Sequence, residues 1–154
     1  MTYRIQGLAP EPFRPLFRMN DEELRERRAV RVVASGSGEP CRVSLQDAAA
    51  GEQLILVNHV SQDADTPFRA THAIYVREQA EAAPVFEDEL PPQIDRRNVS
   101  LRAFDRDGMM VQAVLAAAGE GDGAVRALLE RPEVAEIHAH TQALGCFLAR
   151  IERN

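Results

Sequence analysis

The side chains best suited to chemistry lie near the C-terminus, in a stretch that contains His138, His140, Cys146 and Arg150. Imidazole can act as a base, a nucleophile or a metal ligand, a thiolate is a nucleophile, and a guanidinium binds anions. Alternate residues of a strand share one face, so His138 and His140 are expected to point the same way. The pattern predicts a pocket for a small anionic ligand, binding or catalytic. His140 and Cys146 are its candidate catalytic groups, and His138 and Arg150 its candidate ligand-binding groups.

A β-hairpin is needed to position these groups. Residues 134–140 and 146–152 are predicted to form its two strands, paired antiparallel. Burying apolar surface contributes about 25 cal/mol per Å² to stability, which in total exceeds the contribution of an exposed ion pair. The apolar residues are therefore expected to determine the register. That register sets Glu136 opposite Arg150, His138 opposite Leu148, and His140 opposite Cys146. It buries together Ile137, Ala139, Phe147 and Ala149.

Other interpretations of the two histidines stay open. A metal ion would need a third donor, such as His72, His59 or Cys146, and because no spacing demands one we expect no metal. The string His138-Ala-His140-Thr-Gln142 resembles the active-site strand of histidine-triad nucleotidyl transferases, and that resemblance implies His140 as a nucleophile toward phosphate. The structural alternative is that both histidines are half-buried and hydrogen-bonded.

Cys146 has two interpretations as well. Opposite His140 it would be a thiol beside a possible base, with Arg150 on the same face. A free cysteine more often behaves as a small buried hydrophobe.

Arg42, Arg69 and Arg102 lie beside or within predicted strands and are flanked by apolar residues. An arginine there needs a carboxylate partner or an anionic ligand. Structural ion pairs are therefore an alternative to ligand binding, and the available internal partners are Asp63, Asp65, Asp105 and Glu136. Every basic residue in the chain is an arginine, which is typical of a GC-rich genome and makes any single arginine less informative.

Composition limits the class of protein. A chain of 154 residues with 45% hydrophobic content suits a single domain, 1–154, with its own core. No apolar run is long enough for a membrane span, no signal peptide is evident, and two distant cysteines fit a reducing compartment, so we expect a cytoplasmic protein. The net charge of −6 argues against a nucleic-acid binder. No motif indicates a cofactor.

The remaining pattern predicts an α+β fold: a mostly antiparallel sheet, two or three short helices and the C-terminal β-hairpin. Asn20 and Glu23 form a capping-box pattern for a helix to about Arg28, and Asp122 is the expected cap of a later helix that ends near Pro132. The acidic, proline-containing segment at about 78–96 is predicted to be a long loop. It is also the contact surface of a non-enzymatic alternative, a dimerising or partner-binding module. Strands are predicted at 3–7, 29–34, 41–45, 53–60, 71–77, 99–104 and 109–115.

Four sequence blocks carry a wider resemblance. They are Pro40-Cys-Arg-Val-Ser-Leu45, Asp65-Thr-Pro-Phe-Arg-Ala70 with Ala73-Ile-Tyr-Val-Arg-Glu78, Arg102-Ala-Phe-Asp105, and the stretch from His140 through Gly145-Cys146 to Arg150. In order and spacing they resemble the bacterial family catalogued as domain of unknown function 1203. The resemblance implies a free-standing, single-domain bacterial protein. It implies no particular activity, substrate or cofactor.

Overall fold

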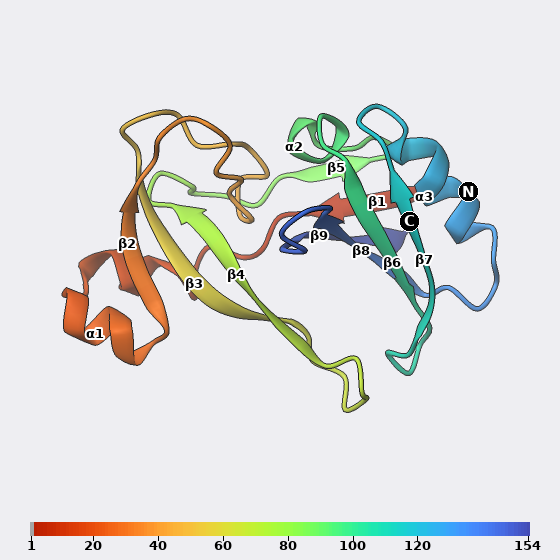
Figure 1. Ribbon diagram of the computed structural model, residues 1–154, viewed down its shortest axis with the longest axis horizontal. Coiled ribbons are helices and arrows are strands. Elements are labelled where there is room, and N and C mark those ends of the chain that lie inside the picture. The colour runs from red at the N-terminus through yellow and green to blue at the C-terminus, as the bar shows by residue number, and fades with distance from the viewer. Residues whose placement is uncertain (1) are drawn as a thin grey trace.

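Two antiparallel β-sheets and a few short helices make up the protein, seen in a computed structural model that describes residues 2–154 (Figure 1). The larger sheet has the strand order β5-β1-β9-β8-β6-β7 and the smaller one the order β2-β3-β4. The predicted α+β class, mostly antiparallel with short helices and a C-terminal strand pair, is confirmed. The strands of the larger sheet are β1 (Tyr3–Gln6), β5 (Val85–Glu87), β6 (Val99–Phe104), β7 (Met110–Ala116), β8 (Glu136–Thr141) and β9 (Phe147–Arg153), and those of the smaller sheet are β2 (Ala29–Val33), β3 (Gln53–Gln62) and β4 (Ala70–Arg77).

The helices are short and lie at the margins of the sheets. They are the 3₁₀ helix η1 (Arg14–Arg18), α1 (Asp21–Glu26), α2 (Pro92–Asp95) and α3 (Gly121–Leu129). The predicted capping box of α1 is present, since the side chains of Asn20 and Glu23 each accept a hydrogen bond from the other's backbone N–H. None of the helices within residues 2–154 is long and apolar enough to cross a membrane.

One face of the larger sheet packs against α3 and forms the main core. Val125, Leu128 and Leu129 are the large buried side chains of α3. The predicted cap is wrong: Glu120 is the N-cap residue and makes no side-chain cap bond. The Asp122 carboxylate instead accepts a hydrogen bond of 2.6 Å from the Tyr3 hydroxyl, which ties α3 to β1.

A second core lies under the smaller sheet. Ile55, Val57, Ile74 and Val76 share one face of β3 and β4 and pack with α1 and with Phe147 of β9. The far end of the β3–β4 hairpin reaches the β6–β7 turn, where the Thr66 hydroxyl donates a hydrogen bond of 3.1 Å to the carbonyl of Gly108 (Figure 1). Phe147 and this hairpin therefore join the two sheets.

The register of the C-terminal hairpin differs from the prediction. His138 lies opposite Arg150, and a bulge between Ala139 and His140 sets His140 opposite Phe147. The extra residue at the bulge sends Leu148 into the main core and turns Phe147 to the opposite face, beside the histidines. Cys146 is thus not the cross-strand neighbour of His140. The predicted ion pair does form, with Arg150 Nε 3.4 Å from Glu136 Oε2.

Residues 41–45 were predicted to be a strand and form a turn instead. Isolated bridges at Pro40 and Cys41 hold this turn, and Leu45, with a φ of 55°, closes it. Gly7 passes so close that a Cβ at that position would lie 1.9 Å from the Val43 carbonyl oxygen, so only glycine fits. The Leu8 N–H donates a bond of 2.8 Å to the Arg42 carbonyl, and these contacts fix Arg42 between the sheets.

The acidic segment at 78–96 is not a plain loop. It contains β5, which pairs with β1 at the edge of the larger sheet, and α2. The Asp88 carboxylate accepts a hydrogen bond of 3.1 Å from the Tyr3 N–H. This segment is therefore built into the larger sheet.

Candidate functional site

All four histidines of the chain meet between the two sheets, around the ring of Phe147. The rings of His138 and His140 lie 5.5 and 5.8 Å from the Phe147 ring, and that of His59 lies 5.9 Å from it, measured between centroids. His72 meets His140 edge to face at 4.8 Å. We refer to His59, His72, His138 and His140 as the histidine cluster.

Two members of the cluster are fully buried and hydrogen-bonded locally, and His59 and His72 are partly buried. His138 and His140 are each 2% exposed. His138 Nε2 lies 2.9 Å from Glu136 Oε1, and His140 Nδ1 lies 2.9 Å from the carbonyl oxygen of Gly145. His138 and His140 share a face, as predicted, and are sealed beneath other side chains.

Burial also fixes the charge state of the cluster. Desolvation lowers the pKa of His140 to about 3, despite its bond to the Gly145 carbonyl. Burial lowers the pKa values of His59 and His72 as well, with Arg42 and Arg102 as nearby charges that add to the effect. His59, His72 and His140 are therefore neutral at physiological pH. The pKa of Glu136 is lowered by its hydrogen bond to His138.

Two of the sequence hypotheses receive no support from this geometry. Within residues 2–154, no group of three or more histidine, cysteine, aspartate or glutamate side chains is arranged to hold a metal ion. The histidine-triad hypothesis requires an exposed nucleophile, and His140 is almost fully enclosed.

The four candidate arginines have different surroundings. Arg69 is exposed and pairs with Asp63 at 2.5 Å, the internal partner that the structural interpretation names. Arg150 is exposed and binds Glu136 and Glu152. Arg102 lies opposite His138 in the β6–β8 ladder and makes no ion pair or side-chain hydrogen bond within residues 2–154. The arginines do not converge on one point.

Arg42 is the exceptional one. Its side chain is only 2% exposed, and within the described residues it has no carboxylate partner. Nε donates a hydrogen bond of 2.7 Å to the carbonyl oxygen of Phe147, and Nη1 donates one to the carbonyl oxygen of Pro40. Nη2 makes no hydrogen bond within residues 2–154. Desolvation lowers the pKa of Arg42 to about 10, so it remains a cation at neutral pH.

Arg42 lies between two cavities. The first, which we call the apolar cavity, has a volume of about 550 Å³. Its walls include Leu56, Ala73 and Tyr75 of the smaller sheet, Cys146, and the exposed Leu144 of the β8–β9 turn. Its other charged side chain besides Arg42 is Arg97, which binds Asp47, and its lining contains no carboxylate.

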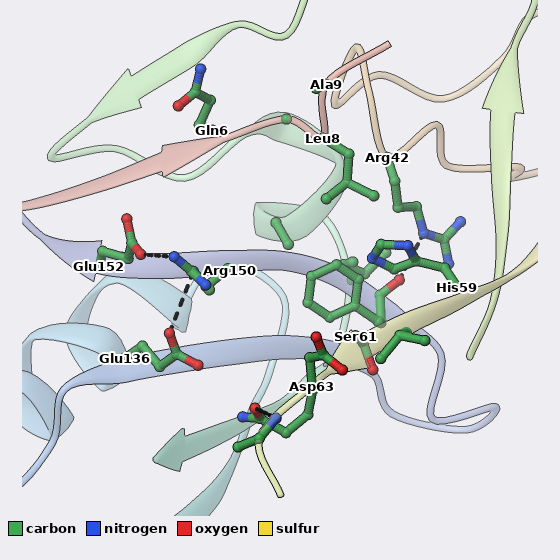
Figure 2. Close-up of a pocket in the computed structure, with 17 residues that line it drawn as sticks. Gln6, Leu8, Ala9, Arg42, His59, Ser61, Asp63, Glu136, Arg150 and Glu152 are labelled. Atoms are coloured by element: carbon green, nitrogen blue, oxygen red, sulfur yellow. Dashed lines mark hydrogen bonds and ion pairs between the residues drawn. The ribbon is translucent and has the colours of Figure 1, made fainter. Parts of the chain in front are cut away.

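The second, which we call the polar cavity, has a volume of about 420 Å³ and is shown in Figure 2. Arg42 and His59 stand at one end of it, and Glu136, Arg150 and Glu152 at the other, where dashed lines mark the ion pairs of Arg150. Ser61 and Asp63 lie between these ends, and Gln62 also lines the cavity. His138 and His140 line neither cavity.

Some of these residues were not identified from the sequence. Ser61 and Gln62 carry no motif, and their exposure to a cavity depends on a bulge in β3 between Val60 and Gln62. Leu56 and Tyr75 could be predicted to face the same side from strand alternation. That this side forms a cavity wall depends on the fold of the turn at 41–45.

A family described as "Protein of unknown function (DUF1203)" matches residues 38–153. The chain belongs to this family. No curated protein and no solved structure matches it. The part of the chain that matches DUF1203 contains the histidine cluster and every residue that lines the apolar cavity. The polar cavity also uses residues 6–9, which lie outside the match.

Proposed function

We propose that the protein binds a small organic anion with an apolar body in the apolar cavity, with Arg42 as its ionic partner. The observation that carries the proposal is the buried guanidinium of Arg42, which has no carboxylate partner in residues 2–154. Buried charges in proteins are normally paired, because removing an ion from water costs several kcal/mol or more. Two backbone carbonyls offset part of that cost and leave the positive charge uncompensated.

The lining of the apolar cavity supports two features of the proposed ligand, its negative charge and its apolar body. Its lining contains no carboxylate, and of its two arginines Arg97 is paired with Asp47, so the charge of Arg42 makes the local potential favour an anion. Leu56, Tyr75 and Leu144 offer apolar surface for the body of the ligand. The polar cavity, which contains Asp63, Glu136 and Glu152, is a poorer place for an anion.

A matched pair of fluorescent probes tests the charge requirement. 1-Anilinonaphthalene-8-sulfonate is an apolar anion, and N-phenyl-1-naphthylamine is the same skeleton without the sulfonate. The wild-type protein should bind the anion at least tenfold more tightly than the neutral probe, because a charge-assisted hydrogen bond contributes about 1.5–3 kcal/mol. Arg42→Met should abolish that preference, and Arg69→Met, which alters an exposed paired arginine, should leave it unchanged.

The location is tested separately, since Arg42→Met also removes two backbone contacts and could unfold the chain. Saturating sulfonate probe should slow alkylation of Cys146 by iodoacetamide, with the fully buried Cys41 as internal control. Ala73→Trp places a large ring in the cavity from an exposed strand position and should weaken the binding of both probes. Equal affinity of the wild type for both probes, or alkylation of Cys146 at the same rate with and without probe, would contradict the proposal.

A further inference from the structure

Ser61 occupies an unusual position in β3. The register of β3 against β4 shifts between Val60 and Gln62, so Ser61 is the extra residue of a β-bulge. Bulges re-aim side chains and are common beside active sites. Ser61 lines the polar cavity (Figure 2). Its Oγ lies 2.6 Å from Nδ1 of His72.

His72 has the properties of a general base toward this hydroxyl. Burial and the charge of Arg102 lower its pKa, so at neutral pH the ring is uncharged. In the tautomer that carries its proton on Nε2, Nδ1 can accept the proton of the Ser61 hydroxyl, which also lies 3.3 Å from the Ala70 carbonyl oxygen. The ring is held on its other side by the edge-to-face contact with His140. A serine hydroxyl within hydrogen-bond reach of a neutral, oriented imidazole is the arrangement that activates a nucleophile.

The same cavity contains hydrogen-bond donors for a developing negative charge. Gln62 is 7% exposed, and its side-chain amide lies beside Glu136, whose pKa its hydrogen bond helps to lower. Its Oε1 is already used as the acceptor of the Ala64 N–H at 3.1 Å. Shared with a ligand oxygen in the cavity, the amide N–H would help to stabilise the negative charge. The guanidinium of Arg42 lines the same space.

We propose that Ser61 and His72 form a nucleophile–base pair that hydrolyses a small carboxylic ester in the polar cavity. Ser61 Oγ bonds to the carbonyl carbon while its proton passes to His72 Nδ1. The bond from that carbon to the alkoxy oxygen then breaks, and the proton passes to the departing alcohol. Water, deprotonated by His72, releases the acid from the acyl-serine and restores both side chains.

The charges of the cavity select the class of ester. Three carboxylates, Asp63, Glu136 and Glu152, line it together with the guanidinium groups of Arg42 and Arg150. An uncharged or cationic ester is therefore favoured over an anionic one. The activity rests on the Ser61–His72 contact and not on the anion-binding proposal, although Arg42 lines both cavities.

The purified full-length chain should form a covalent adduct with an alkyl fluorophosphonate, located by peptide mass spectrometry at Ser61, and should hydrolyse p-nitrophenyl acetate. Ser61→Ala should abolish the adduct, and His72→Gln should slow its formation at least 100-fold, the lower end of a general-base effect of about 10²–10⁴. Ser100→Ala is the matched control, because Ser100 lies opposite His140 in the β6–β8 ladder and should not affect labelling.

The pH profile separates this role from a structural one. Because the pKa of His72 lies below its usual value, the labelling rate should be constant between about pH 7 and 8 and should fall only in more acidic solution. The proposal is overturned if no adduct forms at Ser61 of the folded wild type, if the adduct persists in Ser61→Ala, or if the rate does not depend on His72.

Discussion

The two faces of the larger sheet differ in what they bury. The face under α3 is closed by aliphatic side chains such as Leu101, Ile137 and Leu129, each at most 1% exposed. The opposite face is closed by the histidine cluster and Phe147, with Arg102 and Arg42 nearby. One face is built mainly from aliphatic side chains, and the other is built mainly from aromatic and titratable ones and adjoins two cavities.

The two faces therefore have different roles: one stabilises the fold, and the other holds the groups that can do chemistry. Aliphatic packing is indifferent to pH, whereas every buried imidazole makes stability depend on protonation. Both cavities, Arg42 and the Ser61–His72 pair lie on the histidine side. The face under α3 therefore supports the fold, and the histidine face is where a ligand or substrate is expected.

The largest effect should come from truncating the side chain that closes each face. Leu101→Ala and Phe147→Ala should each lower the free energy of unfolding by about 3–5 kcal/mol at pH 7.5, measured by urea denaturation. At pH 5 the cost of Leu101→Ala should be unchanged. The cost of Phe147→Ala should shrink, because the opened cluster admits water and its histidines protonate more easily. Identical costs for both variants at both pH values would remove the distinction between the faces.

A smaller decrease in the free energy of unfolding should result from lowering the pH of the wild-type protein. Unfolded histidine titrates near pH 6.5, whereas folded His140 has a pKa of about 3, so below pH 6.5 the unfolded state binds more protons and stability falls. For one such group the loss is about 1.4 kcal/mol per pH unit, or about 2 kcal/mol between pH 6.5 and 5.

His140→Gln removes this group and should reduce the pH dependence of unfolding by about that amount. Carboxylates with lowered pKa values, such as Glu136 and Glu52, lose their contribution only below their normal range, near pH 4.5. An unchanged slope between pH 6.5 and 5 in His140→Gln would show that His140 is not a buried neutral group.

The smallest effect should come from the polar contact at the edge of the apolar face. Tyr3 is fully buried, and its burial and hydrogen bond to Asp122 raise the pKa of its hydroxyl well above the usual value. Tyr3→Phe should lower the free energy of unfolding by about 1.5 kcal/mol, the lower end of the contribution of one hydrogen bond to a charged group, because Asp122 is partly exposed. That loss should be the same at pH 7.5 and pH 5. A loss confined to one pH would indicate coupling to the histidine face.

The sequence predicted the fold better than the site for a physical reason. The alternation of side chains along a strand and the Asn20 capping box are local signals. The first is confirmed in β4, and the second at the start of α1. The hairpin register was wrong for two reasons. The turn shifts the pairing by one residue, so His140 lies opposite Phe147, and the bulged Leu148 adds a second shift and exchanges the faces of Phe147 and its neighbour.

The histidine cluster also could not be fully predicted, because part of it depends on contacts between residues that are far apart in the sequence. The shared face of His138 and His140 followed from a spacing of two residues. Their meeting with His59 and His72 depends on how the β3–β4 hairpin crosses the larger sheet, and no spacing in the sequence encodes that contact. The isolation of Arg42 from carboxylates likewise arises from a turn that the sequence pattern presented as a strand.

The central claim is that Arg42 holds an organic anion in the apolar cavity. Crystals of the protein grown with 4-iodobenzoate test it directly, because the anomalous signal of iodine locates the ring without ambiguity. The account predicts iodine in the apolar cavity near Leu56 and Tyr75, with the carboxylate about 3 Å from Arg42 Nη2. Iodine in the polar cavity, or a carboxylate that points away from Arg42, would contradict it.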